Sequence, residues 1–394
     1  MPDPIIFTTH SSWFSRLGAS FRGVVTGLIL ALAGIVLLFW NEGRSVDAIR
    51  ANAEGAANVV AVDANRIDPA NEGRLVHVSA PALAEGVRQD AALGIQSDAL
   101  ILMRKVEYYQ WQQTAKSETR TKLGGGEETT TTYSYAREWS DFARDSSGFH
   151  QPAGHENPAP TLKNESFSAE HGKVGAFGVD AAVLNGLSAD HPFQITTEQA
   201  EIATKALSRP ASVTEGRLYI GDNPAEPKVG DMKISYVTAP QGMAVSIIGG
   251  QTRGTIQPYP TKAGAQILMV RAGTASAEQM FAQAKSANRT TAWVLRAIGF
   301  VVLVAGFKMV LGPLGVLADV LPLLGSIVRM GTGFIAMVSG LALGTLTIAI
   351  AWLFYRPLLA VALFVLIGAG IYGAIWWRRR RTASATPPVA SPAA

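Results

Sequence analysis

The sequence contains no cysteine, so disulfide bonds, thiolate catalysis and cysteine-based zinc sites are excluded. Charge is also scarce: charged residues make up 16 % of the chain, hydrophobic residues make up 48 %, and the formal net charge is +4. Four of the positive charges are consecutive, on Arg378, Arg379, Arg380 and Arg381. Basic residues that follow an apolar helix fix its orientation and meet anionic lipid. We therefore expect membrane lipid, and no nucleic acid, as a partner.

Two long runs near the C-terminus contain no charged residue. Residues 331–354 and 358–377 comprise 24 and 20 residues. At about 1.5 Å per helical residue, each can cross a hydrocarbon core about 30 Å thick. Tyr355-Arg356-Pro357 separates the two runs and is predicted to form a tight turn, with Arg356 and Pro357 as its structural residues. Together the runs predict an integral membrane protein.

Two further apolar segments bring the prediction to four transmembrane helices. Residues 23–40 form the first. Ala51-Asn52-Ala53 resembles a signal-peptide cleavage site, but the 18-residue apolar core is longer than the usual ~7–15, which favours a retained span. Residues 291–311 form the second, because the long side chains of Arg296 and Lys308 near its ends can reach the interfaces.

The polar middle of the chain, residues 41–290, is predicted to fold as an α+β domain with mostly antiparallel strands. Its clearest signal is a long β-hairpin, residues 99–114 and 129–141, with Gly124-Gly125-Gly126 between them. No Lys-Ser/Thr follows these glycines, so a turn is preferred over a phosphate-binding loop. The other predicted elements are the strands Arg74–Ala80, Arg217–Ile220, Lys233–Thr238, Met243–Gly249 and Gln266–Arg271 and the helices Thr196–Ala206 and Ser276–Ser286.

The predicted topology places both termini in the cytoplasm, because four spans are an even number and the four arginines follow the last one. Residues 312–330, which prolines and an aspartate interrupt, are predicted to lie in the interface. The predicted segments are a cytoplasmic N-terminus 1–22, transmembrane helices 23–40, 291–311, 331–354 and 358–377, an extracytoplasmic α+β domain 41–290, an interfacial amphipathic segment 312–330, and a basic, then disordered cytoplasmic tail 378–394.

A series of short segments gives the chain a resemblance to a known family. In order they are Asn41–Arg44, Asn71–His77, Tyr109–Trp111, Tyr133–Tyr135, Glu138-Trp139, Gly154-His155, Asn157-Pro158, Val229–Asp231, Thr261-Lys262, Leu295–Ala297 and Trp352–Pro357. From about Gly27 to Trp377 the chain resembles the transmembrane protein 43 (LUMA) family. It departs from the family pattern in Glu156, in its lack of cysteine and in its four-arginine ending.

The resemblance implies one N-terminal span, a large lumenal or extracytoplasmic domain and three C-terminal spans. It also implies self-association and binding to other membrane proteins, without an established enzyme activity. Animal members lie in the endoplasmic reticulum and inner nuclear membrane and have a role in nuclear-envelope organisation. The composition suggests a bacterial member, for which we expect the plasma (inner) membrane, a periplasmic large domain and a role limited to membrane organisation.

Glycines inside the predicted spans are candidates for helix packing. Gly23 with Gly27, and Gly340 with Gly344, have the four-residue spacing that lets two helices approach closely. Gly370 begins a weaker version that ends in alanine. These glycines predict tight packing within the protomer or oligomerisation between protomers.

The tetrapeptide Asn-Glu-Gly-Arg occurs twice, at Asn41–Arg44 and at Asn71–Arg74. Asparagine and glycine adopt left-handed conformations that end helices or make turns, so we expect structural turns, with Asn71, Glu72, Gly73 and Arg74 forming the second. The alternative is that the two Glu/Arg pairs tether the soluble domain at the membrane surface.

His155 and Glu156 are weak candidates for an acid–base or metal site, with His150, His171 and Asp180 nearby in the sequence. No His-Glu-x-x-His spacing is present, and the candidates lie in a predicted loop, so exposed polar loop residues are the preferred interpretation. We expect no cofactor, no metal and no catalytic residue.

These observations support two functions of different classes. The first is a non-enzymatic membrane scaffold that forms homo-oligomers and organises other membrane proteins through its extracytoplasmic domain. The alternative is a membrane-tethered extracytoplasmic enzyme or protein quality-control factor with a site near His155 and Glu156. A transporter is disfavoured, because the interiors of the spans lack the ionisable groups that an ion pathway needs.

Overall fold

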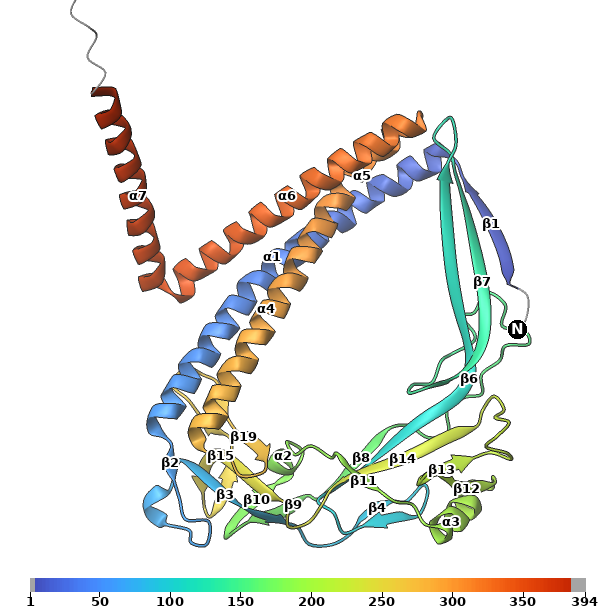
Figure 1. Ribbon diagram of the computed structural model, residues 1–394, viewed down its shortest axis with the longest axis vertical. Helices are drawn as coiled ribbons and strands as arrows, with labels where there is room; N and C mark the ends of the chain where they lie inside the picture. Colours follow the sequence, from blue (N-terminus) through green and yellow to red (C-terminus); the bar gives the residue numbers. More distant parts are fainter. Residues whose placement is uncertain (1–3, 384–394) are drawn as a thin grey trace, which may run out of the picture. The chain divides into compact units, whose positions relative to one another are not determined.

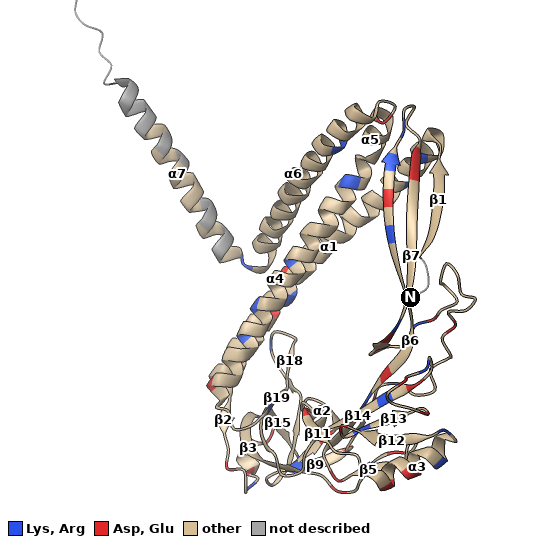
Figure 2. Ribbon diagram, turned by 45° about the vertical axis from the view of Figure 1, so that its right-hand side comes forward, with Lys and Arg blue, Asp and Glu red and all other residues tan. Residues whose placement is uncertain are grey.

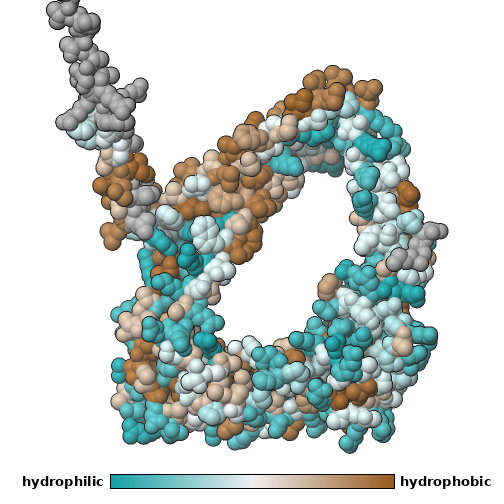
Figure 3. Space-filling view, in the orientation of Figure 1, coloured by the Kyte–Doolittle hydropathy of each residue, from teal (hydrophilic) through white to brown (hydrophobic). Residues whose placement is uncertain are grey.

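The computed structural model describes residues 4–383 and divides into two compact units (Figure 1). The β-rich unit comprises Met1–Trp13 and Ala48–Ala287, and the helical unit comprises Phe14–Asp47 and Asn288–Ala394. Side chains in the β-rich unit are largely hydrophilic, whereas hydrophobic side chains gather on α6 (Pro322–Tyr355) in the helical unit (Figure 3). Lys, Arg, Asp and Glu are correspondingly sparse on α6 (Figure 2).

The first sheet of the β-rich unit has eight strands, in the order β1-β7-β6-β14-β13-β12, with β11 paired to β14 and β8 to β6. All its pairings are antiparallel, as the sequence predicts. Buried and half-exposed residues alternate along β14, which places one face of this sheet on a core. Its strands are β1 (Ile5–Ser11), β6 (Ile101–Thr121), β7 (Glu127–Ser140), β8 (Glu165–Ser168), β11 (His191–Phe193), β12 (Ala211–Thr214), β13 (Arg217–Ile220) and β14 (Met232–Ala239).

The second sheet has seven strands, in the order β19-β15-β16-β10-β9-β3-β2. Two of its pairings, β2 with β3 and β10 with β16, are parallel, and the others are antiparallel. Its strands are β2 (Val60–Ala61), β3 (Leu75–Leu83), β9 (His171–Val174), β10 (Phe177–Asp180), β15 (Ala244–Thr252), β16 (Thr255–Gln257) and β19 (Met269–Ala272). The remaining short elements are β4 (Arg88–Asp90) with β5 (Ile95–Ser97), β17 (Tyr259–Pro260) with β18 (Gln266–Ile267), the 3₁₀ turn Pro69–Asn71, and the helices α2 (Ala181–Leu184) and α3 (Thr197–Leu207).

The predicted α+β class with mostly antiparallel strands is confirmed for the β-rich unit. Local chemistry explains individual boundaries: Thr196 accepts a hydrogen bond from the backbone N–H of Gln199, and the Gln199 side chain accepts one from the backbone N–H of Thr196. This capping box starts α3 one residue after the predicted position. The predicted strand Arg217–Ile220 is β13.

The predicted hairpin is confirmed but is longer than expected. β6 and β7 pair from Tyr108 opposite Ser140 to Thr121 opposite Glu127. Gly124 and Gly125 have φ angles of +87° and +79° in the connecting turn, a conformation that glycine adopts without steric cost. A third strand, β1, pairs with the outer part of β7, from Ile5 opposite Tyr133 to Ser11 opposite Glu127. We call the outer part of this three-stranded structure, residues 5–11 and 112–134, the arm.

The strand β1 has no counterpart in the sequence prediction. The predicted topology puts residues 1–22 on the cytoplasmic side and residues 41–290 outside, but β1 belongs to the β-rich unit together with β7. The pairing places residues 5–11 and residues 127–133 in one sheet, and the predicted sides of the membrane for residues 1–22 and 41–290 stay predictions. The helix α1 (Trp13–Asn58) therefore connects two strands, β1 and β2, of the same unit.

The helical unit contains three helices that are long and apolar enough to cross a membrane. They are α1, α4 (Ala277–Val310) and α6, which have 46, 34 and 34 residues. Two shorter elements follow α4 and α6, namely α5 (Gly312–Ala318) and α7 (Pro357–Ala383).

The C-terminal part of the prediction lies partly outside the described residues. Four arginines are expected to set the orientation and to contact lipid, but their side chains lie outside the described part of the structure. Residues 384–394 also lie outside it. These arginines are Arg378, Arg379, Arg380 and Arg381. The fourth span at residues 358–377, the lipid contact and the tail at residues 378–394 therefore stay predictions.

Several helix boundaries differ from those expected. The span predicted for residues 23–40 is the centre of α1, and the helix predicted at Ser276–Ser286 continues without a break into the span predicted for residues 291–311. Residues 312–330 are not a single interfacial helix: Pro322 begins α6 nine residues before the expected start at 331. A proline at the first position of a helix lacks only an N–H that would have no partner there, so it starts a helix rather than interrupting it.

Candidate functional site

A buried ion pair joins two helices of the helical unit. Glu42 of α1 is 0 % exposed, and Arg296 of α4 donates to both of its carboxylate oxygens, from Nε at 2.6 Å and from Nη2 at 2.9 Å. The indole Nε1 of Trp352 on α6 donates to Glu42 Oε2 at 2.9 Å. The guanidinium of Arg296 also lies 4.9 Å from the ring centre of Trp293. One carboxylate thus holds three helices together.

Backbone groups complete this cluster. The side-chain amide of Asn41 donates to the carbonyl of Ala292 at 3.0 Å, and that of Asn288 donates to the carbonyl of Ser45 at 3.1 Å. Both asparagines are buried, and each bonds to the opposite helix, so two further hydrogen bonds join α1 to α4 beside the ion pair. Buried polar groups with such partners fix one arrangement of neighbouring helices.

Gly43 lets an aromatic ring approach α1 closely. A Cβ atom at this position would lie 2.7 Å from Cζ of Tyr355, the last residue of α6. The first Asn-Glu-Gly-Arg tetrapeptide is therefore not the expected turn but a helical segment whose Asn, Glu and Gly each contact another helix. We refer to Asn41, Glu42, Gly43, Arg296 and Trp352 as the Glu42 cluster.

A second buried carboxylate lies at the other end of the long helices. Asp319 is 0 % exposed, and Arg16 of α1 and Arg329 of α6 both donate to it at 2.5 Å. Arg16 and Glu42 are 26 residues apart (42 − 16) on one continuous helix, or about 39 Å. This separation is close to the total thickness of a bilayer, about 40–45 Å. The two carboxylate clusters therefore bracket an apolar segment that is long enough to cross the membrane.

The predicted packing glycines lie at contacts within the chain. A Cβ at Gly27 would lie 2.6 Å from the carbonyl oxygen of Gly306, one at Gly340 would lie 2.7 Å from Val304, and one at Gly344 would lie 2.3 Å from Phe300. Gly23 has an ordinary contact of 4.0 Å with Met309, and a Cβ at Gly370 would have no neighbour within 4 Å among the described residues. Of the two alternatives for these glycines, the described contacts are those of packing within the protomer.

His155 and Glu156 do not converge on a common point in the structure. His155 is buried, stacks on Tyr135 with ring centres 3.8 Å apart, and meets Trp111 edge-on at 4.7 Å. Glu156 is exposed and accepts a hydrogen bond from the backbone N–H of Gly154, which lowers the pKa of its carboxyl group. His150 stacks separately on Tyr133, with ring centres 4.2 Å apart. Aromatic packing occupies both histidines.

The second tetrapeptide connects two turns of the β-rich unit. Gly73 has a φ angle of +72°, and its N–H donates to the carbonyl of Gln251. The carboxylate of Glu72 accepts hydrogen bonds from the backbone N–H of Arg253 at 2.9 and 3.2 Å. Arg74 reaches Asn71 Oδ1 at 3.5 Å. In the helical unit, Arg356 follows the last residue of α6 and Pro357 begins α7.

The two buried carboxylates form ion pairs between helices. Among residues 4–383, no group of three or more His, Asp or Glu side chains could hold a metal ion. Glu42 and Asp319 are each fully engaged by cationic side chains. The positions of Glu42 and Arg296 as partners could not be inferred from the sequence, although both lie in segments that carry the family resemblance.

The fold and the Glu42 cluster define a multi-pass membrane protein with a large β-rich unit. The sequence profile of the family described as Transmembrane protein 43 matches residues 108–357. The chain is 31 % identical over 365 residues to transmembrane protein 43 of Rattus norvegicus (89 % of each chain) and 30 % identical over 368 residues to that of Homo sapiens (90 % of each chain). It is 28 % identical over 363 residues to the Drosophila melanogaster homolog, and this alignment covers 90 % of the present chain and 93 % of the homolog.

The chain belongs to the transmembrane protein 43 family. The resemblance that the short segments indicate is therefore confirmed. No solved structure gives a significant match to the chain.

Proposed function

We propose that this protein is a membrane scaffold that self-associates and organises other membrane proteins through its β-rich unit. The observation that carries the proposal is the arm. Its side chains are exposed or half-exposed on both faces for most of its length. The three buried clusters of apolar side chains in the described residues draw no member from positions 109–134. An isolated small sheet without an apolar face is marginally stable, which favours a partner along the arm.

The edge of the arm has the features of a strand that accepts a partner. In β1, Ile6 is 65 % exposed and Phe7 is 47 % exposed. The strand contains no proline and no lysine, the residues with which proteins commonly protect a free edge. An added strand would gain backbone hydrogen bonds from β1 and would place side chains beside Ile6 on one face of the sheet and beside Phe7 on the other.

The glycine contacts of the helical unit also favour the arm as the surface for self-association. Gly27, Gly340 and Gly344 already lie against neighbouring helices of the chain, so the arm, rather than these glycines, is the surface we assign to self-association.

We place the β-rich unit on the face of the membrane opposite Arg378–Arg381, since basic residues that follow a span favour the cytoplasm. A periplasmic location in a bacterial cell follows from that placement.

The test is the native mass of the full chain in mild detergent. We expect an oligomer for the wild type and a shift toward the monomer for Ile6→Lys, because a lysine on a free edge opposes strand addition. Val87→Lys is the matched control, since Val87 is an exposed side chain outside the arm, with 56 % of its surface exposed. A wild-type chain that is strictly monomeric and co-purifies with no membrane protein would refute the scaffold.

A further inference from the structure

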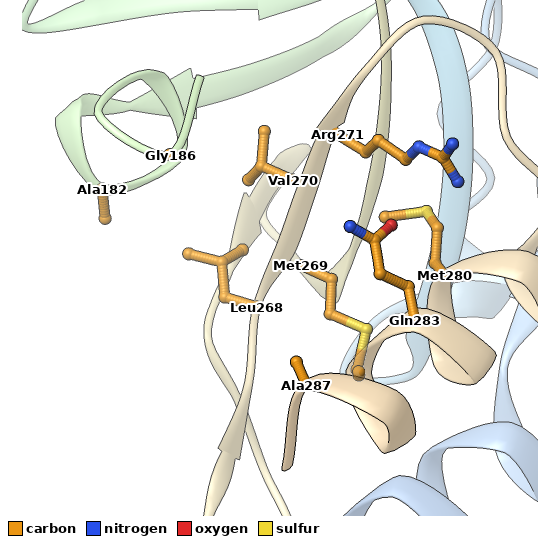
Figure 4. A pocket seen from close by; sticks show the side chains of 10 residues that line it. Ala182, Gly186, Leu268, Met269, Val270, Arg271, Met280, Gln283 and Ala287 are labelled. Atoms are coloured by element: carbon orange, nitrogen blue, oxygen red, sulfur yellow. The ribbon is translucent and has the colours of Figure 1, made fainter. Parts of the chain in front are cut away.

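A cavity in the β-rich unit has a composition that neither the scaffold function nor the family match explains. It has a volume of about 380 Å³ and lies beside the edge strand β19, between the end of α2 and the first turns of α4 (Figure 4). Binding pockets for small molecules range from about 300 to 1,000 Å³. The lining residues are Ala182, Gly186, Leu268, Met269, Val270, Arg271, Met280, Gln283, Ala284 and Ala287.

Most of the cavity wall is apolar and adaptable. Leu268 and Val270 point toward α2, whereas Met269 lies on the other side of β19, the side of Met280 and Ala287 (Figure 4). Methionine side chains are flexible and polarisable, so they adapt to chains of variable shape. Such a wall suits an alkyl chain better than a planar or strongly polar ligand.

Two polar groups stand at this otherwise apolar cavity. The guanidinium of Arg271 and the amide of Gln283 lie on the same side of β19 as Met280 (Figure 4). Arg271 is exposed, and within residues 4–383 its side chain has no hydrogen bond or ion pair. A guanidinium binds carboxylate and phosphate through paired N–H groups, and an amide N–H₂ adds a further donor. The positive charge of Arg271 at the cavity therefore complements an anionic head group.

The helix that forms one wall also leads toward the membrane. Ala287 of the cavity wall is five residues before Ala292, where the apolar part of α4 begins. A ligand with an alkyl chain has a natural source in the bilayer.

We propose that this cavity binds a single-chain anionic lipid, with its alkyl chain against Met269 and Met280 and its carboxylate or phosphate on Arg271. A peptide added to β19 fits less well. The strand has four residues and would supply few backbone hydrogen bonds to an extended partner. The cavity volume also corresponds to one chain rather than to a segment with several side chains.

The experiment uses the full chain in phosphatidylcholine nanodiscs and a photoreactive fatty acid as the probe. We expect cross-links to map to residues 268–287, and unlabelled oleate to compete at least tenfold better than oleyl alcohol, which has the same chain without the charge. Ala287→Trp, which fills the cavity, should abolish labelling. Arg271→Gln should lower it at least fivefold and remove the preference for oleate over the alcohol.

Arg289→Gln is the matched control, because Arg289 is an exposed arginine of α4 outside the cavity wall. It should label like the wild type. Competition by lysophosphatidylglycerol as strong as that by oleate would identify the head group as a phosphate, and competition by oleate alone would identify a free fatty acid. Labelling that both Ala287→Trp and Arg271→Gln leave unchanged would overturn the site, as would displacement of the probe by a co-purified peptide.

Discussion

Glu42 and Arg296 form a two-pronged ion pair between α1 and α4, with N–O distances of 2.6 and 2.9 Å and a carboxylate that is 0 % exposed. The two residues are 254 positions apart in the sequence, and the pair receives a third hydrogen bond from Trp352. Removing one partner of a buried pair leaves an uncompensated charge, which costs about 3–5 kcal/mol.

We therefore predict that Arg296→Met strongly destabilises the helical unit, because it leaves Glu42 charged and buried. The double variant Glu42→Gln with Arg296→Met should recover most of the loss, since it removes both charges. Thermal unfolding of the full chain in detergent measures this coupling. If the double variant is as unstable as the single one, packing rather than charge is the role of Arg296.

The glycine contacts give a second prediction. Gly27→Leu should destabilise the packing of α1 against α4 by about 1–3 kcal/mol, because the new Cβ would meet a backbone oxygen that cannot move aside. Gly370→Leu is the matched control and should be neutral, since no described residue lies within 4 Å of a Cβ there. Unfolding temperatures in the same detergent distinguish the two. Equal effects at both positions would indicate that only helix propensity changes.

The β-rich unit should lose stability at alkaline pH. Tyr236 donates to Asp90 at 2.5 Å, and burial together with this bond and the Asp90 charge raises its pKa above the ordinary value of about 10. Burial also raises the pKa of Tyr219, and the hydrogen bond that Tyr219 donates to Asp231 raises it further. Below about pH 10 both tyrosines are protonated in the folded and the unfolded chain.

Above about pH 10 the unfolded chain loses these protons while the folded chain keeps them, so the free energy of unfolding falls as pH rises. The slope is up to about 1.4 kcal/mol per pH unit for each tyrosine. Denaturant unfolding between about pH 8 and about pH 11.5 measures it. Tyr236→Phe should flatten the slope by one tyrosine's share, because Tyr219 and Tyr108, whose pKa values burial also raises, remain. A slope that is unchanged in this variant would exclude Tyr236 as the titrating group.

The pairing of β1 with β7 predicts a shared compartment for two distant parts of the sequence. Because the chain has no cysteine, His10→Cys and Glu118→Cys each introduce a single thiol at an exposed position. We expect a membrane-impermeant maleimide to label both from the same side of sealed vesicles. Labelling from opposite sides would mean that β1 separates from β7 when α1 crosses the membrane.

Sequence patterns predict the parts of this fold that local chemistry determines. The hairpin follows from aromatic and threonine-rich strands around glycines, and α3 follows from its Thr196 cap. Long apolar runs likewise identify the centres of α1, α4 and α6. Their ends are less accurate, because a window of apolar residues does not show that a helix continues past Ser286 or begins at Pro322.

The Glu42 cluster is harder to predict from the sequence than the fold. Glu42, Arg296 and Trp352 are separated by more than 250 and 50 residues along the chain (296 − 42 and 352 − 296), and no local pattern pairs them. The composition of Asn41–Arg44 is typical of turns, whereas helix contacts decide its conformation. The strand β1 escapes prediction because seven residues without a neighbouring partner carry little signal. Its partner follows more than a hundred residues later.

The long separation between Glu42 and Arg296 also has a consequence for biosynthesis. At about 5–20 residues per second, the ribosome adds the intervening 254 residues in roughly 13–50 s. Throughout that interval α1 exists without the arginine that neutralises its carboxylate, and Asp319 has yet to reach Arg16. The nascent first helix must therefore keep Glu42 in water or rest against the insertion machinery until α4 emerges.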